Sequence, residues 1–307
     1  MTGTKAWLAL AGLFLAVPAA AATCVPAPVA AIGVMPSASA QLLLPVTLNG
    51  RASIFELDTG ADLSLVSGRQ ASALGLTTRT APNPLLAGAD GKPLSDYVSV
   101  GDFTIGTLRQ GAATLVLVPG WSALDDRAAG LIGGDVLTRW DLGLDVAAGA
   151  ISFYRNDACP AGLAPFSGRA YSAAIDVIDG HAVVMVTLDG QVLTALIDTG
   201  ATRSSMPLDL AGRRFGLRAG GAGVTQTPGT ITSSGGRLAT WRRRFAMLDV
   251  AGLQLAAPEI DLIARQSSPN LAGTHDMVLG LPELRRMRLY LSYRRRRLYV
   301  AANGQAG

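Results

Sequence analysis

The feature that most constrains this 307-residue chain is an Asp-Thr-Gly tripeptide that occurs twice inside a longer repeated frame. The first copy of the frame runs from Val46 to Ala61 and the second from Val186 to Ala201, a constant spacing of 140 residues without a gap. In each copy an apolar segment leads directly into the aspartate and then into a tight glycine-containing turn. The repeat predicts two similar halves that each contribute one carboxylate to a common site.

A second shared signature lies about 75 residues after each turn, where two apolar residues precede a glycine and an aliphatic strand follows. The signature is Leu131-Ile132-Gly133 in the first half and Val278-Leu279-Gly280 in the second. Together with the doubled turn, this pattern resembles the aspartic peptidases. The segment Asp58 to Asp62 is more similar to the retroviral (retropepsin) form than to pepsin, whose turns carry Ser or Thr where Ala61 stands. The resemblance extends from Gln41 to Ala301.

Length and composition suit the fold that this resemblance implies. The chain is long enough for two domains of ordinary size. Aromatic residues make up only 6% of it, and 36 glycines and 16 prolines are spread along it, which favours many short strands over long helices. We expect an all-β protein with two similar β-barrel-like acid-protease lobes, short helices and a catalytic cleft between the lobes. The expected divisions are an N-terminal lobe over 41–160, a linker over 161–170 and a C-terminal lobe over 171–303.

The beginning of the chain predicts export. Residues 1–22 combine Lys5, an apolar run over 7–17 and three alanines at 20–22, as in a cleaved signal peptide. The alternative of an uncleaved anchor is disfavoured because the apolar run is shorter than the roughly 20 residues of a membrane-spanning helix. Residues 23–40 are rich in Ala and Pro without periodicity, so we expect an extended lead-in, with order beginning near Leu42. The predicted location is periplasmic or secreted.

The chain has two cysteines, Cys24 and Cys159. In an oxidising compartment such a pair predicts one disulfide between the mature N-terminus and the end of the first half. Two free thiols are the alternative.

Charge and motifs limit the partners. Arginines gather at 242–244 and 294–297 in the second half, where they would attract an anionic membrane surface weakly or simply protect a solvated strand edge. No nucleic-acid module is recognisable.

The two histidines, His181 and His275, have no zinc-binding spacing, and the chain has no phosphate-binding loop. We therefore expect a monomer that needs no metal or cofactor and that takes a peptide or protein substrate.

The resemblance implies a catalytic role for Asp58 and Asp198. Two adjacent carboxylates share one proton, so the ionised one can activate a water molecule while the protonated one hydrogen-bonds the peptide carbonyl. The resemblance also implies that the hydroxyls of Thr59 and Thr199 reach the backbone of the opposite turn. Gly60 and Gly200 have supporting roles, because a residue without a side chain leaves room for backbone N–H groups to approach the carboxylates.

The resemblance also places a flap hairpin over residues 86–97, with Gly88, Asp90 and Gly91 as substrate-contacting candidates, and a second hairpin over 220–241. Asp62 is a further substrate-binding candidate. The arginine that would brace it in retroviral enzymes is absent, because Gly134 and Asp135 follow Gly133. No partner for Asp62 is therefore predicted.

Local signals predict short helices after both turns. Ser67 can cap a helix that continues through Leu74, with Gly75 beyond its end. Pro207 suits the first turn of a helix that runs to Phe215.

The sequence thus predicts an aspartic endopeptidase. Two rival hypotheses stay open at this point. One is a catalytically silent protein of the cell envelope that has the same fold and binds peptides, and the other is a structural envelope protein that adheres through its basic lobe.

Overall fold

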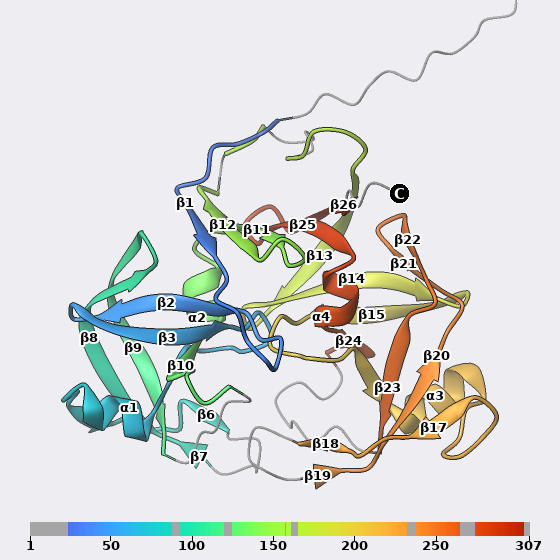
Figure 1. Ribbon diagram of the computed structural model, residues 1–307, viewed down its shortest axis with the longest axis horizontal. Helices are drawn as coiled ribbons and strands as arrows, with labels where there is room; N and C mark the ends of the chain where they lie inside the picture. The colour runs from blue at the N-terminus through green and yellow to red at the C-terminus, as the bar shows by residue number, and fades with distance from the viewer. Residues whose placement is uncertain are drawn as a thin grey trace, which may run out of the picture.

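The structure is a computed structural model that describes residues 24–87, 93–119, 125–156, 158–160, 165–231, 237–264 and 274–303. It consists mostly of β-strands, arranged as two lobes side by side with a shared sheet across one end of them (Figure 1). The expected all-β, two-lobed fold is confirmed. Among the described residues, no helix has the length and apolar character needed to cross a membrane.

The first lobe is a closed barrel. Its strands follow the order β2-β3-β10-β4-β9-β8, and β8 pairs with β2 to close it. Asn49 and Gly50, with φ angles of 50° and 78°, form the tight turn of the predicted hairpin between β2 and β3. The strands are β2 (Leu43–Leu48), β3 (Arg51–Leu57), β4 (Leu65–Ser67), β8 (Asp96–Ile105), β9 (Leu108–Val118) and β10 (Gly130–Ile132), with β5 (Thr78–Thr80) paired to β8.

The second lobe repeats this arrangement. Its strands follow the order β14-β15-β24-β16-β23-β20-β17, and β21 pairs with β14 where β8 pairs with β2 in the first lobe. Asp189 and Gly190 form the corresponding turn, with φ angles of 43° and 83°. The strands are β14 (His181–Leu188), β15 (Gln191–Ile197), β16 (Ser205–Pro207), β17 (Val224–Gln226), β20 (Thr240–Arg244), β21 (Met247–Val250), β22 (Leu253–Ala256), β23 (Glu259–Ile263) and β24 (Met277–Leu279).

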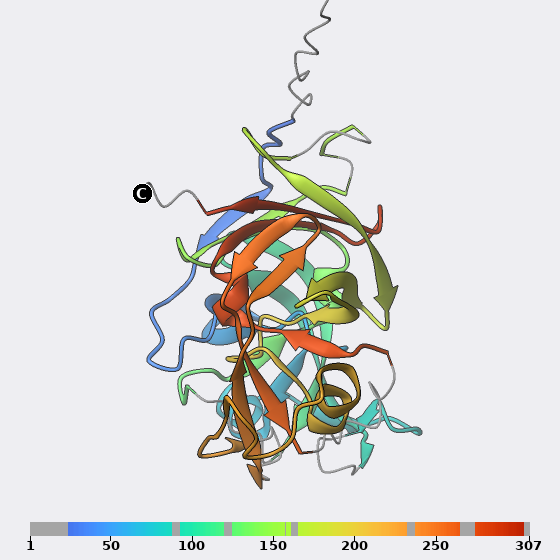
Figure 2. The ribbon, with the colours of Figure 1, turned by 90° about the vertical axis from the view of Figure 1, so that its right-hand side faces the viewer.

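The shared sheet takes three neighbouring strands from each half and lies at one end of the molecule (Figures 1 and 2). Its order is β1-β12-β11-β25-β26-β13. The expectation that order begins near Leu42 is wrong, because β1 pairs with β12 and buries alternate residues. The strands are β1 (Ala30–Gly33), β11 (Asp141–Asp145), β12 (Ala150–Tyr154), β13 (Tyr171–Ile178), β25 (Met287–Ser292) and β26 (Arg297–Ala302).

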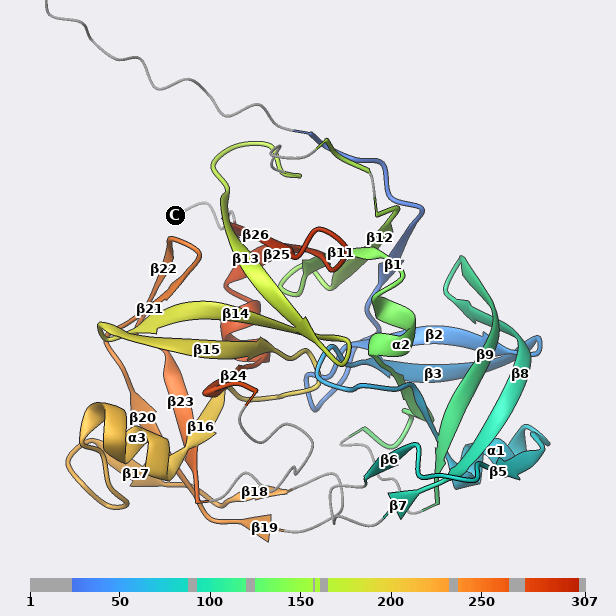
Figure 3. The same cartoon turned by 180° about the vertical axis from the view of Figure 1, so that it is seen from behind.

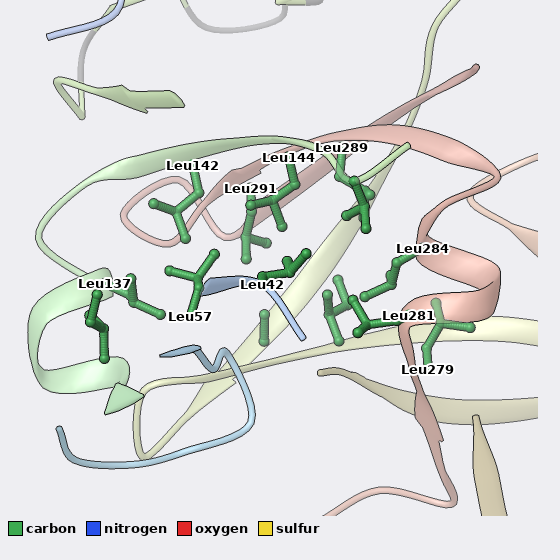
Figure 4. Packing of buried hydrophobic residues seen from close by; sticks show 14 of the residues in the cluster. Leu42, Leu57, Leu137, Leu142, Leu144, Leu279, Leu281, Leu284, Leu289 and Leu291 are labelled. Atoms are coloured by element: carbon green, nitrogen blue, oxygen red, sulfur yellow. The ribbon is translucent and has the colours of Figure 1, made fainter. Parts of the chain in front are cut away.

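A layer of leucines packs between the shared sheet and the lobes (Figure 4). It includes side chains from the short helices α2 (Gly134–Leu137) and α4 (Leu281–Leu284), which follow the two glycine signatures. Each fully buried leucine contributes about 1.5–3 kcal/mol through burial of apolar surface. The layer joins the two halves into one core beneath the Asp-Thr-Gly turns. The labelled members are Leu42, Leu57, Leu137, Leu142, Leu144, Leu279, Leu281, Leu284, Leu289 and Leu291.

The two longer helices begin and end close to where the sequence predicts. Helix α1 covers Gly68–Ala73, and the Ser67 hydroxyl accepts a hydrogen bond from the N–H of Gln70 at 3.1 Å. Helix α3 covers Leu208–Phe215 and ends at Gly216, which has a φ of 68°. Pro207 precedes α3 as its N-cap and does not lie inside the first turn as expected, because its extended ψ of 135° ends β16.

Two short hairpins occupy the segments where flaps are predicted. The first pairs β6 (Leu86–Ala87) with β7 (Pro93–Leu94), and the second pairs β18 (Thr230–Ile231) with β19 (Arg237–Leu238). Both lie at the end of the molecule away from the shared sheet (Figures 1 and 3). The candidate residues Gly88, Asp90 and Gly91, like the predicted signal peptide, fall outside the described residues.

A disulfide joins Cys24 to Cys159 across a sequence separation of 135 residues, which confirms the predicted pairing. It fixes the chain just before β1 to the segment just after β12, so it joins these two antiparallel strands at one end of the pair. The closed loop contains the whole first lobe.

Reduction of this disulfide is expected to lower the free energy of unfolding by about 4–5 kcal/mol, because the open chain regains the entropy of a long loop. Chemical denaturation with and without reductant measures the loss, and the double variant Cys24→Ser/Cys159→Ser serves as the non-reducible comparison. Equal unfolding midpoints for all three samples would contradict a stabilising role.

Candidate active site

Each Asp-Thr-Gly turn begins where a buried strand ends. Strand β3 runs parallel to β10, and the N–H of Asp58 donates a hydrogen bond to the carbonyl of Ile132 at 3.1 Å. Strand β15 runs parallel to β24, and Asp198 makes the equivalent bond to Leu279 at 3.1 Å. The strands of the two apolar signatures therefore fix the position of each aspartate at the end of its own strand.

The glycines of these signatures are required by close backbone packing. A Cβ atom on Gly133 would lie 2.6 Å from the carbonyl carbon of Leu63, and one on Gly280 would lie 2.6 Å from the carbonyl oxygen of Arg203. Backbone atoms cannot move aside as a flexible side chain could. Only glycine fits beneath each turn.

The threonines of the two turns are fully buried and bind each other's backbone. The Thr59 hydroxyl donates to the carbonyl of Ile197 at 2.7 Å and accepts from the N–H of Thr199 at 3.0 Å. The Thr199 hydroxyl donates to the carbonyl of Leu57 at 2.7 Å and accepts from the N–H of Thr59 at 3.0 Å. These four hydrogen bonds set the distance between the turns.

The carboxyl group of each turn lies over the glycine of the other. A Cβ atom on Gly60 would lie 2.4 Å from Cγ of Asp198, and one on Gly200 would lie 2.5 Å from Cγ of Asp58. Each carboxyl group lies close enough to the other to shift its pKa. Both aspartates are partly exposed, so a water molecule or substrate can reach them.

The two carboxyl groups have unequal surroundings. Burial raises the pKa of Asp58 well above its usual 3.8, the negative charges of Asp198 and Glu56 add to this, and only the N–H of Gly60 opposes it, at 2.9 Å. Burial also raises the pKa of Asp198, but two following backbone N–H groups donate to its Oδ1 at 2.8 and 3.0 Å and oppose the rise. The backbone therefore stabilises a negative charge better on Asp198, which accepts two N–H hydrogen bonds, than on Asp58, which accepts one.

A buried serine beneath each turn links it to the short helix that follows the glycine signature. The Ser64 hydroxyl accepts from the N–H of Gly133 at 3.0 Å and donates to Asp135 at 2.7 Å. In the second lobe Ser204 accepts from the N–H of Gly280 at 2.8 Å and contacts Glu283. Sequence reasoning missed these pairs, although both serines keep the repeat's spacing and an acidic residue follows both glycines.

Asp62 has a partner that the sequence did not predict. His181, at the start of β14 in the second lobe, places Nε2 at 2.9 Å from Oδ1 of Asp62 in the first lobe. The imidazole is 1% exposed and the carboxylate 25%. Burial lowers the pKa of His181, but the hydrogen bond to Asp62 and its negative charge outweigh burial, so the pKa is raised overall. Asp62 thus has a partner from the opposite lobe, and the contact becomes an ion pair when His181 is protonated.

The structure therefore brings together Asp58, Asp198, both threonines and both glycines at the junction of the lobes. Asp62 is linked to this group by His181, which contacts Asp62 and whose pKa is affected by the charge of Asp198. Within the described ranges, no three His, Cys, Asp or Glu side chains are arranged to hold a metal ion.

The chain matches one protein-family model, described as an aspartyl protease, over residues 44–136 and 184–282. The two matched stretches each contain one Asp-Thr-Gly turn and one glycine signature, and together they cover more than half of the chain. No curated protein matches the chain in sequence.

The Asp62–His181 pair is expected to stabilise the fold in a pH-dependent way. Because the folded pKa of His181 is raised above 6.5, its contribution is fully present below pH 6.5 and is lost as pH rises through the folded value. His181→Gln should reduce the free energy of unfolding by about 1–3 kcal/mol at pH 5.5 and by less at pH 9. Denaturant titrations of wild type, His181→Gln and Asp62→Asn across this range measure the effect. A loss that does not change with pH would show that the imidazole acts through packing alone.

Proposed function

Because the chain belongs to the aspartyl protease family, we propose that it is an endopeptidase in which Asp58 and Asp198 activate a water molecule to hydrolyse peptide bonds. The observation that carries this proposal is the position of each carboxyl group over the glycine of the opposite turn, where both carboxyl groups are partly exposed. The substrate class is a peptide or an unfolded protein segment.

The asymmetry of the pair assigns the roles. Asp198, whose charge two backbone N–H groups stabilise, removes a proton from the water molecule. The hydroxide oxygen bonds to the peptide carbonyl carbon while Asp58 gives its proton to the carbonyl oxygen, which forms a neutral gem-diol. Asp198 then passes the proton it took to the leaving nitrogen, Asp58 recovers a proton from a gem-diol hydroxyl, and the C–N bond breaks. The products are an amine and a carboxylic acid, and the pair returns to its starting state.

We also propose that the protein works outside the cytoplasm. The Cys24–Cys159 disulfide supports this location, since such bonds persist in oxidising compartments. The predicted cleavage before Thr23 would leave Cys24 near the mature N-terminus.

Loss of either carboxylate is expected to abolish hydrolysis. Asp58→Asn and Asp198→Asn should each lower kcat/KM on a peptide library by about 10²–10⁴-fold, because general acid or base catalysis is lost. Asp176→Asn, which removes an exposed carboxylate from β13, is the matched control and should keep wild-type turnover. Cleavage products are identified by mass spectrometry.

Stability separates loss of chemistry from loss of fold. Each Asn variant should unfold at the same or a higher temperature than wild type at pH 7, because the raised pKa values mean that ionisation of the buried pair opposes folding. A wild-type protein that binds library peptides but cleaves none would favour the silent binding protein. Full turnover in either Asn variant would contradict the shared-pair mechanism.

A further inference from the structure

The mechanism leaves one buried carboxylate near the pair without a role. Glu56 lies in β3, two residues before Asp58. Side chains alternate along a strand, so Phe55 and Leu57 enter the barrel core while Glu56 and Asp58 lie on the opposite face. Glu56 is 5% exposed, which is rare for a carboxylate that has no cationic partner.

Glu56 is only half satisfied by its surroundings. Nε2 of Gln41 donates to one carboxylate oxygen, and the other oxygen, Oε1, has no hydrogen-bond partner. In the part of the chain that the structure describes, no Lys, Arg or His forms an ion pair with it. Burial, together with the negative charges of Asp198 and Asp125, raises its pKa to about 7 although the Gln41 hydrogen bond opposes the rise.

The second lobe has an apolar residue at the position that corresponds to Glu56. The residue 140 positions after Glu56 is Leu196, which is buried in a small apolar cluster separate from the main core. The first-lobe counterparts of that cluster are apolar as well and pair directly with Glu56 in the sheet. The cluster is Val183, Leu196 and Val278, and the residues beside Glu56 are Leu43 and Leu131.

We propose that Glu56 is a specificity-determining residue that selects a lysine or arginine side chain of the peptide next to the scissile bond. This inference rests on the proposed endopeptidase function. An apolar side chain of the substrate next to Glu56 would leave Oε1 buried without a partner, and an acidic side chain would add a further negative charge. A cationic side chain would supply the missing donors and offset a site whose nearby charges are carboxylates. Asp58, two residues along the chain and partly exposed, lies close enough to Glu56 for their charges to interact, so a substrate held at Asp58 lies next to this carboxylate.

The test compares peptides that are identical except for lysine or norleucine at the positions flanking the scissile bond. At pH 7 wild type should favour lysine in kcat/KM by about tenfold or more at one of these positions, because the cation satisfies a buried group that norleucine leaves unpaired. The ratio should fall towards pH 5 as Glu56 becomes protonated. Since both peptides meet the same catalytic pair at each pH, titration of Asp58 and Asp198 cancels from the ratio.

Two variants identify Glu56 as the source of the preference. Glu56→Gln keeps the side-chain shape and should give a ratio near one that does not change with pH, whereas Glu56→Leu, which copies Leu196, should favour norleucine. Asp176→Asn, which removes an exposed carboxylate from the second lobe, should leave the preference unchanged. Thermal unfolding of each variant checks the fold, and Glu56→Gln decides the matter if the leucine variant does not fold.

The outcomes separate this inference from the function on which it rests. A wild type that cleaves both peptides equally, or a lysine preference that survives in Glu56→Gln, would overturn the role of Glu56 and leave the endopeptidase intact. A wild type that cleaves neither these peptides nor any library peptide would overturn the proposed function itself.

Discussion

The exchange of hydrogen bonds between Thr59 and Thr199 is the contact on which the site depends. Each hydroxyl is fully buried and both donates to and accepts from the opposite lobe, so neither turn can hold its geometry without the other. A buried hydrogen bond is costly to leave unmade, which makes this cross-lobe arrangement strongly preferred over separated lobes. The two glycines can then sit under the opposing carboxyl groups, and two acids that would repel each other are held close enough to share a proton.

Around this nearly symmetric centre the two lobes differ in chemistry. His181 reaches from the second lobe to Asp62, whereas Gln41, which occupies the same repeat position in the first lobe, bonds to Glu56. Two backbone N–H groups stabilise the charge of Asp198 and one does so for Asp58. These differences place two identical turns in unequal surroundings, and they give the two sides of the pair different polarity.

The sequence predicted the features that local signals determine. The doubled turns, the Asn49-Gly50 hairpin and the Ser67 cap each depend on a few adjacent residues, and the structure has all three. The Cys24–Cys159 bond was predictable because the chain offers one possible intramolecular pairing. Family resemblance added the fold and the contact between the turns.

The features that the sequence did not reveal depend on contacts between distant segments. Strand β1 is an alanine-rich stretch that has no pattern of its own and becomes a strand only through pairing with β12. The His181–Asp62 pair joins residues that are far apart in the sequence, and nothing local marks either as a partner. Glu56 looks like an ordinary exposed position of an alternating strand until the structure shows it buried beside Asp58.

The pH dependence of kcat/KM, measured on a peptide without ionisable side chains, tests most directly whether the two carboxyl groups act as one pair with a shared proton. A bell-shaped profile is expected, in which activity rises as the pair loses its first proton and falls as it loses the second. The falling limb should lie well above the usual carboxyl pKa of 3.8, because burial and the charge of Asp198 hold the proton on Asp58. A profile with a single ionisation, or a falling limb near pH 4, would contradict the shared-proton site.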